Sequence, residues 1–140
     1  MSTDEVTSRL SPGSPVPRSP AEARREVEFL LHELFCLPES ERDEDVLADT
    51  LLVTSELVTN ALLHGGGITD FEAELTREGL RVSVSDRSDQ VPTAPERTDA
   101  RGMIRVGGHG WPVICRLARS IAITYRAGGG KCVSALVPLA

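Results

Sequence analysis

The sequence predicts one α/β domain built as a two-layer sandwich, with helices on one face of a largely antiparallel sheet. A long helical pattern covers residues 45–64, and two pairs of alternating strands follow it, over residues 69–86 and 120–138. A length of 140 residues with 40% hydrophobic content is enough for a single core.

The N-terminal segment, residues 1–18, is polar and proline-rich, so we expect a disordered tail ahead of a domain over residues 19–140. A first helix should begin after Ser19, an N-cap residue, with Pro20 in its first turn, and should end near residue 36. Its apolar stripe either packs on the long helix or stays exposed as a partner site. The stripe consists of Val27, Leu30, Leu31 and Leu34.

The helix over residues 45–64 is apolar nearly all round, which predicts a buried position, and it should stop at the glycines of residues 65–67. Glu56 and Asn60 lie one turn apart on one face of it. A magnesium nucleotide would satisfy both, because an amide oxygen suits Mg²⁺ and the carboxylate could orient or deprotonate a nucleophile. The alternative is that Glu56 caps a neighbouring segment and Asn60 bonds backbone.

The next segment alternates as a hairpin does, with strands over residues 69–76 and 80–86 and a turn at Glu78 and Gly79. The second strand ends on Asp86. A carboxylate there could accept a hydrogen bond from an exocyclic amine such as that of adenine, or it could simply be a turn residue.

Residues 87–107 contain two prolines and four arginines and show little periodicity, so they form either a phosphate-contacting loop or a solvated one. Gly107, Gly108 and Gly110 then lead into a predicted helix over residues 111–118. Glycines before a helix let backbone N–H groups approach phosphate, although a flexible turn is the alternative. The chain has no Walker loop and no dinucleotide fingerprint.

Composition narrows the possible functions. The net charge of −6 argues against a nucleic-acid surface, and no apolar run of about 18 residues predicts a membrane span. The polar N-terminus carries no secretory signal, so we expect a cytoplasmic protein. Cys36, Cys115 and Cys132 are scattered with no C-x-x-C pair, which predicts reduced core residues.

The order and spacing of these features resemble the GHKL, or Bergerat-fold, ATP-binding domain shared by histidine kinases, gyrase-type ATPases and anti-sigma-factor serine kinases. The likeness is greatest to the small actinobacterial anti-sigma regulatory factors of the serine/threonine protein kinase type. Their pattern can be followed from Ser55 to Val133, and its first block, Ser-Glu-Leu-Val-Thr-Asn-Ala, is specific. The resemblance covers about residues 20–138.

The resemblance implies roles for the matching residues. Asn60 resembles the Mg²⁺ ligand, Glu56 the acid/base or water-orienting carboxylate, and Asp86 the adenine-specifying aspartate. The other matching ATP-binding positions are Ser88, which supports the aspartate, Gly108, Gly110 and Cys132.

The chain departs from the family pattern at several positions. Cys132 stands where the family usually has threonine near the adenine, and Trp111 where its phosphate loop continues with leucine, while residues 119–123 replace a Trp-Gly pair. These departures predict weaker nucleotide binding, which Cys132→Thr should tighten in an otherwise intact pocket. His64 matches the histidine that closes the first block, where its imidazole can also simply interact with the last helix carbonyls.

The function implied by the resemblance is an anti-sigma factor that binds ATP and Mg²⁺, sequesters an alternative sigma factor and phosphorylates a STAS-type antagonist on serine or threonine. The alternative is a non-catalytic anti-sigma or adaptor protein that keeps the ATP-binding fold. Family members pair through the first-helix region, so the resemblance also implies a homodimer, with Arg24 or Arg25 contributing to sigma-factor binding.

Overall fold

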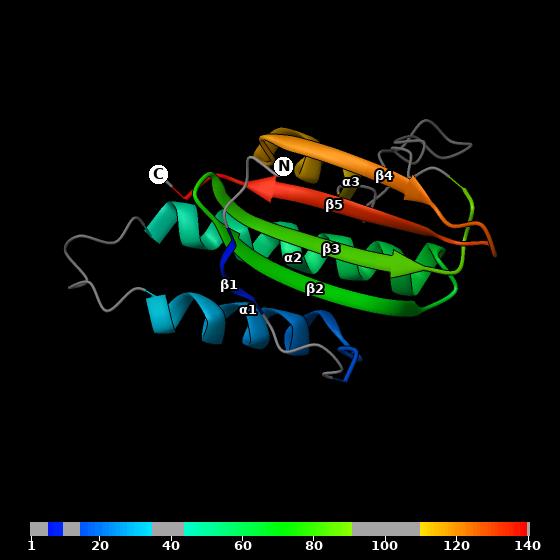
Figure 1. Cartoon of the computed structure of the whole chain (residues 1–140), viewed down its shortest axis with the longest axis horizontal. Helices are drawn as coiled ribbons and strands as arrows, with labels where there is room; N and C mark the ends of the chain where they lie inside the picture. The colour runs from blue at the N-terminus through cyan, green and yellow to red at the C-terminus, as the bar shows by residue number, and fades with distance from the viewer. Residues whose placement is uncertain (1–5, 10–14, 35–43, 91–109, 140) are drawn as a thin grey trace, which may run out of the picture.

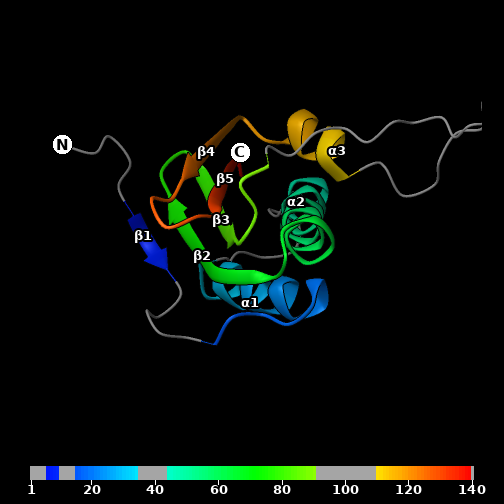
Figure 2. The same ribbon diagram turned by 90° about the vertical axis from the view of Figure 1, so that its right-hand side faces the viewer.

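The computed structural model describes residues 6–9, 15–34, 44–90 and 110–139. Over these residues the chain forms one antiparallel sheet in the order β1-β2-β3-β5-β4, and the helices lie together on one of its faces (Figures 1 and 2). The predicted two-layer α/β sandwich is confirmed. The elements are β1 (Val6–Arg9), α1 (Pro20–Leu34), α2 (Glu44–His64), β2 (Ile68–Thr76), β3 (Gly79–Asp86), α3 (Gly110–Leu117), β4 (Ser120–Tyr125) and β5 (Lys131–Val137).

Helix α1 begins as the sequence predicts, because the Ser19 hydroxyl oxygen accepts a hydrogen bond from the Glu22 backbone N–H at 3.1 Å. Its apolar residues Val27, Leu30 and Leu31 are 0%, 3% and 2% exposed, and the helix packs against α2. Of the two interpretations of this stripe, core packing therefore holds, and the stripe does not form an exposed partner site. The Leu34 side chain lies outside the described residues.

Helix α2 is the central element of the helical layer, with α1 on one side, α3 on the other and the sheet against its inner face (Figure 2). Buried hydroxyls at Thr50, Thr54 and Ser55 donate to carbonyls one turn earlier, at 2.8 to 3.0 Å. These internal bonds allow polar residues on a buried face, since every hydroxyl has its acceptor within the helix.

The sequence was expected to contain no stretch able to span a membrane, but one stretch of α2 meets the criteria. Within the described ranges, Asp45–His64 is long and apolar enough to cross a membrane by length and composition alone, with a mean hydropathy of 1.4 in its most apolar window. The packing of α2 between α1, α3 and the sheet accounts for this composition, because a core helix needs apolar residues on several sides.

Strands β3 and β5 carry core residues on one face and a mixed set on the other, where Ser83 pairs with Ser134 and Arg81 with Leu136. Leu80, Val82 and Val84 of β3 are buried toward the helices. They lie opposite inward-facing residues of β5, with Val84 paired to Val133. Since successive residues point to opposite faces, the next pairs along the strands, Ser85–Cys132 and Asp86–Lys131, lie on alternate sides. This register decides which predicted residues can meet.

The β2–β3 connection is shorter than predicted. Thr76 pairs with Gly79, so Arg77 and Glu78 form the turn, and Gly79 already belongs to β3. Gly79 has a φ of 147°, and a Cβ there would lie 2.1 Å from the Val137 carbonyl oxygen. Glycine is required at this position by both the backbone conformation and the close approach of the C-terminal strand end.

The predicted disordered tail is corrected in part. Val6–Arg9 forms the edge strand β1, which pairs antiparallel with β2. The physical reason is that the outer edge of β2 offers unpaired backbone groups, and a short segment starting with the β-branched residues Val6 and Thr7 can bond to them. Several other predicted features lie outside the described residues. They are most of the 87–107 loop, Gly108 and Cys36.

Candidate functional site

Glu56 and Asn60 lie in the last three turns of α2, both half-buried. Val53 and Leu57, on the same side of the helix, are 0% and 3% exposed, so the two polar side chains lie at the margin of the core. Neither has a hydrogen-bond partner among the residues that the structure describes. A half-buried carboxylate and amide with no protein partner in the described part of the chain are suited to an external polar ligand.

The end of α2 is joined directly to the end of β3. The Ala61 carbonyl accepts from both Gly65 N–H and Gly67 N–H, at 3.1 and 3.0 Å, which ends the helix, and the Gly65 carbonyl accepts from Arg87 N–H at 2.8 Å. A Cβ on Gly65 would lie 2.6 Å from the Asp86 side chain. Asn60 lies about 6 Å along the helix axis from His64, the last residue of α2, at a rise of 1.5 Å per residue, and Gly65, which contacts Asp86, follows directly.

Asp86 is buried at 5% exposure and forms an ion pair with Lys131, itself 4% exposed. The Lys131 ammonium donates to both carboxylate oxygens, at 3.0 Å to Oδ1 and 2.9 Å to Oδ2. Removing one partner of such a pair leaves an uncompensated buried charge, at a cost of about 3–5 kcal/mol. The pair ties the end of β3 to the start of β5.

Ser88 completes this arrangement through its backbone. Its N–H donates to Asp86 Oδ1 at 2.9 Å, and its carbonyl accepts from Lys131 Nζ at 3.3 Å. The Ser88 hydroxyl instead accepts from the Gln90 backbone N–H at 3.1 Å. Ser88 therefore supports Asp86 as the resemblance implies, but by main-chain groups. We call Asp86, Lys131, Ser88 and Gly65 the Asp86 junction.

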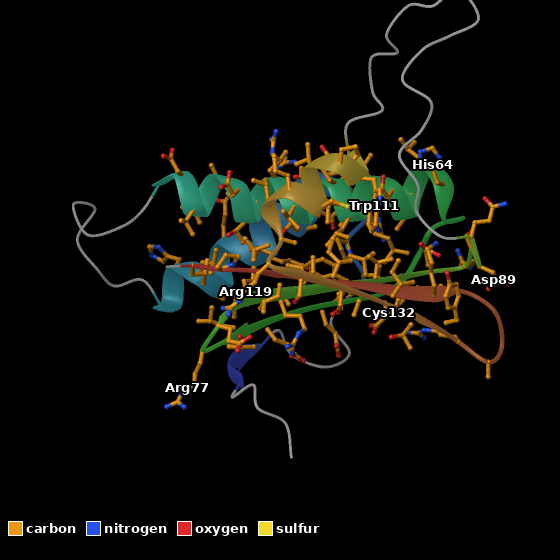
Figure 3. The ribbon with its side chains drawn as sticks, turned by 90° about the horizontal axis from the view of Figure 1, so that it is seen from above. His64, Arg77, Asp89, Trp111, Arg119 and Cys132 are labelled. Carbon is orange, nitrogen blue, oxygen red and sulfur yellow. The ribbon has the colours of Figure 1, made fainter. Side chains whose placement is uncertain are left out.

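Glycines around the Asp86 junction allow the chain to approach it closely. Gly130 donates its N–H to Asp89 Oδ1 at 2.6 Å, and a Cβ there would lie 2.4 Å from the Asp86 carbonyl oxygen. Arg87 donates from Nη1 to the Gly66 carbonyl at 2.9 Å. Figure 3 shows His64 and Asp89 at the same end of the molecule, where α2 and β3 both finish.

The described residues contain no group of three or more His, Cys, Asp or Glu side chains arranged to hold a metal ion. This donor set still fits Mg²⁺ held beside a nucleotide, because that ion commonly keeps waters and takes few protein ligands in addition to phosphate oxygens. Asn60 would be the protein ligand.

Cys132 does not join the other predicted site residues. It pairs with Ser85, while Lys131 pairs with Asp86, so its side chain points to the opposite face of the sheet. Figure 3 shows Cys132 on the side away from the helices. The prediction that it contacts the same ligand as Asp86 is corrected, because the residue facing Asp86 is Lys131.

The remaining predicted residues lie on α2 and α3 or outside the described ranges. His64 is exposed at the last turn of α2, and Gly110 is the first residue of α3. Trp111 is half-buried against the core, with Pro112 in the first turn as predicted. Gly108 lies outside the described residues.

The two candidate partner-binding arginines differ in environment. Arg24 is half-buried and donates from Nη1 to the Ser55 hydroxyl at 2.8 Å, which links α1 to α2 beside Glu56. Arg25 is exposed. Arg24 therefore has a structural contact that Arg25 lacks within the described part of the chain.

Sequence reasoning missed Lys131 as a site residue. The signal was present in the alternation of the last strand, where Lys131 shares the inward positions of Val133, Ala135 and Val137. A lysine in phase with core residues needs a buried partner, but its identity depends on the pairing of β3 with β5.

This helical layer on an antiparallel sheet, with a carboxylate at the end of β3 beside a Glu/Asn-bearing central helix, has the architecture of the GHKL ATPase fold. The chain belongs to the family of histidine kinase-like ATPase domains, whose family model matches residues 15–136. A search of curated proteins found no significant match.

Proposed function

We propose that this protein binds a magnesium adenine nucleotide at the end of the molecule where α2 and β3 both finish. The observation that carries the proposal is the set of polar atoms there: Glu56 and Asn60 have no partner among the described residues, and Asp86 keeps acceptor capacity. Membership of the ATPase-domain family supports the same ligand.

Each residue has a separate role in this proposal. The Asn60 amide oxygen would ligate Mg²⁺, and Asp86 would accept a hydrogen bond from the exocyclic amine of the base. Glu56 would orient or deprotonate the nucleophile, and bound Mg²⁺ would supply neutralisation of phosphate charge.

We further propose that the chain acts as an anti-sigma factor with protein serine/threonine kinase activity toward an antagonist protein. The support is the specific sequence block from Ser55, which contains both Glu56 and Asn60. Arg25, exposed on α1, is the better candidate for contact with a sigma factor, since Arg24 is bonded to Ser55.

Asn60→Ala is the first test of the binding proposal. Loss of the amide ligand should weaken Mg·ATP binding by about 1–3 kcal/mol, the scale of a lost bond to a charged group. Calorimetric titration of the full chain with ATP, with and without Mg²⁺, measures this. Thr59→Ala, a half-buried neighbour on α2, is the control and should bind as the wild type does. Equal Mg²⁺-dependent affinities for wild type and Asn60→Ala would exclude the assigned ligand.

Glu56→Gln tests the chemical role separately. The change keeps shape and removes the charge, so nucleotide affinity should stay close to that of the wild type, while transfer of labelled phosphate to an antagonist protein should be lost. Asp49→Asn on the same helix is the charge control and should transfer normally. Nucleotide binding without transfer in the wild type itself would favour the non-catalytic adaptor protein.

A further inference from the structure

The ammonium of Lys131 has no hydrogen left to offer a ligand. A lysine ammonium carries three protons, and Lys131 donates to Asp86 Oδ1, to Asp86 Oδ2 and to the Ser88 carbonyl, at 3.0, 2.9 and 3.3 Å. Its side chain is 5% exposed, so it cannot turn to another acceptor without leaving a buried position. A ligand placed beside it would therefore find no free donor there.

The Asp86 carboxylate, by contrast, keeps one acceptor position. Each carboxylate oxygen can accept about two hydrogen bonds. Oδ1 already accepts from the Ser88 N–H and from Lys131, whereas Oδ2 accepts only from Lys131 among the described residues. The open position at Oδ2 suits a group that donates one hydrogen bond.

We propose that Lys131 sets the base preference of this site by confining Asp86 to one open acceptor, which takes an exocyclic amine and disfavours a carbonyl at the same place. The inference rests on the nucleotide-binding function proposed above and adds a residue to it. Lys131 is a positioning residue that acts through Asp86. The amine of adenine can donate a hydrogen bond to the open acceptor. The carbonyl of hypoxanthine would face a carboxylate oxygen, which repels it, and an ammonium whose three protons already have acceptors.

Removing Lys131 should weaken this discrimination for a physical reason. Without the ammonium, Asp86 loses the donor that contacts both of its oxygens, and only Oδ1 keeps a partner, the Ser88 N–H, among the described residues. The carboxylate is also released from the orientation that the ammonium imposes. The affinity for a carbonyl-bearing base should then rise relative to that for an amine-bearing base.

The test is a comparison of three nucleotides on the full-length chain. ATP, inosine triphosphate and purine riboside triphosphate carry an amine, a carbonyl and hydrogen at the same ring position. Binding with Mg²⁺ is followed by the fluorescence of Trp111, the single tryptophan, and by calorimetry. The wild type should prefer ATP over the inosine nucleotide by about tenfold or more, and Lys131→Met should bring that ratio toward one.

Arg126→Met is the matched control. Arg126 donates from Nη2 to the Ser85 hydroxyl at 2.7 Å, so the variant loses a cation that contacts the residue before Asp86, on the opposite face of the sheet. Its base preference should equal that of the wild type. A similar loss of preference in both variants would assign the effect to net charge and would overturn the role of Lys131.

A second variant keeps the inference testable if Lys131→Met, which leaves Asp86 buried without its partner, does not fold. Lys131→Met combined with Asp86→Asn removes both buried charges, and the asparagine amide can pair with either an amine or a carbonyl, so the preference should disappear. Retention of the wild-type ATP preference by the single or the double variant would overturn the inference. Equal affinity of the wild type for ATP and purine riboside triphosphate would also overturn the inference, because the amine would then contribute nothing to binding. If the wild type binds none of the three nucleotides, the proposed function itself fails.

Discussion

Glu26 on α1 is an ionisable side chain whose surroundings in the folded state disfavour its charged form. Desolvation by burial raises the pKa of Glu26 above its ordinary value of 4.5, and the neighbouring carboxylate of Glu22, one turn earlier, raises it further. The folded state thus binds the proton more tightly than the unfolded state does. By linkage, this residue lowers stability as pH rises from about 4.5 through the folded pKa.

Glu26→Gln should therefore raise the melting temperature at pH 7, and the gain should vanish below about pH 4, where Glu26 is neutral in both states. The effect should be small because Glu26 is partly exposed. Thermal unfolding between pH 3 and 8 measures it. Glu28→Gln, an exposed change on the same helix, is the control for net charge. A stabilisation that is equal at pH 3.5 and pH 7 would contradict this explanation.

Cys132 lies one position after Lys131 on β5, and this single step places it on the opposite face of the sheet from Asp86. From the resemblance, Cys132→Thr should tighten nucleotide binding, but the β3–β5 register places this side chain on the face away from Asp86. We now expect Cys132→Thr to leave the ATP affinity unchanged. Calorimetric titration of the variant beside the wild type measures this, and a clear gain in affinity would mean that the residue reaches the ligand after all.

The junction between α2 and β3 is the element-scale feature on which the site depends. Gly65 packs directly against Asp86, and the two elements are also joined by the hydrogen bond from Arg87 N–H to the Gly65 carbonyl. The helix that carries Glu56 and Asn60 is held in place relative to the strand that carries Asp86 by this contact. Its geometry leaves no room for a side chain at position 65.

Gly65→Ala should lower the free energy of unfolding by about 1–3 kcal/mol, because the added Cβ would lie 2.6 Å from Asp86 and must displace it. Gly128→Ala is the matched control in the β4–β5 turn, where a Cβ meets nothing within 4 Å and the φ angle is not positive. It should change stability by less than about 1 kcal/mol. Denaturant unfolding of both variants compares them, and equal stabilities would contradict the close contact at Gly65.

At the scale of the whole molecule, the strand order brings together site residues that are far apart in the sequence. The β4–β5 hairpin folds so that β5 lies next to β3 and β4 takes the edge, which puts Lys131 beside Asp86. The helical layer covers the apolar face of that sheet, and the described side chains of the α1 stripe, for which core packing and partner binding were the two alternatives, are buried in it. Among the described side chains of α1, the large apolar one that is exposed is Phe29, at 64%.

We propose that the chain pairs into a homodimer through α1 around Phe29, in place of the buried stripe. Phe29→Glu should then shift the mass measured by light scattering from twice 15.1 kDa toward 15.1 kDa at high protein concentration. Leu63→Glu, at a residue 71% exposed on α2, is the control and should leave the mass unchanged. A wild-type mass of one chain at high concentration would remove the proposal.

The sequence alone determined the features that depend on near neighbours. The Ser19 cap, the one-turn spacing of Glu56 and Asn60 and the alternation of β3 and β5 all arise within a few residues, because helix and strand periods are local. Only the tertiary structure decided that Lys131 pairs with Asp86, 45 positions earlier, that Cys132 faces away, and that Val6–Arg9 extends the sheet. Each of these depends on strand order and register, and a shift of one residue in register exchanges the two faces of a strand.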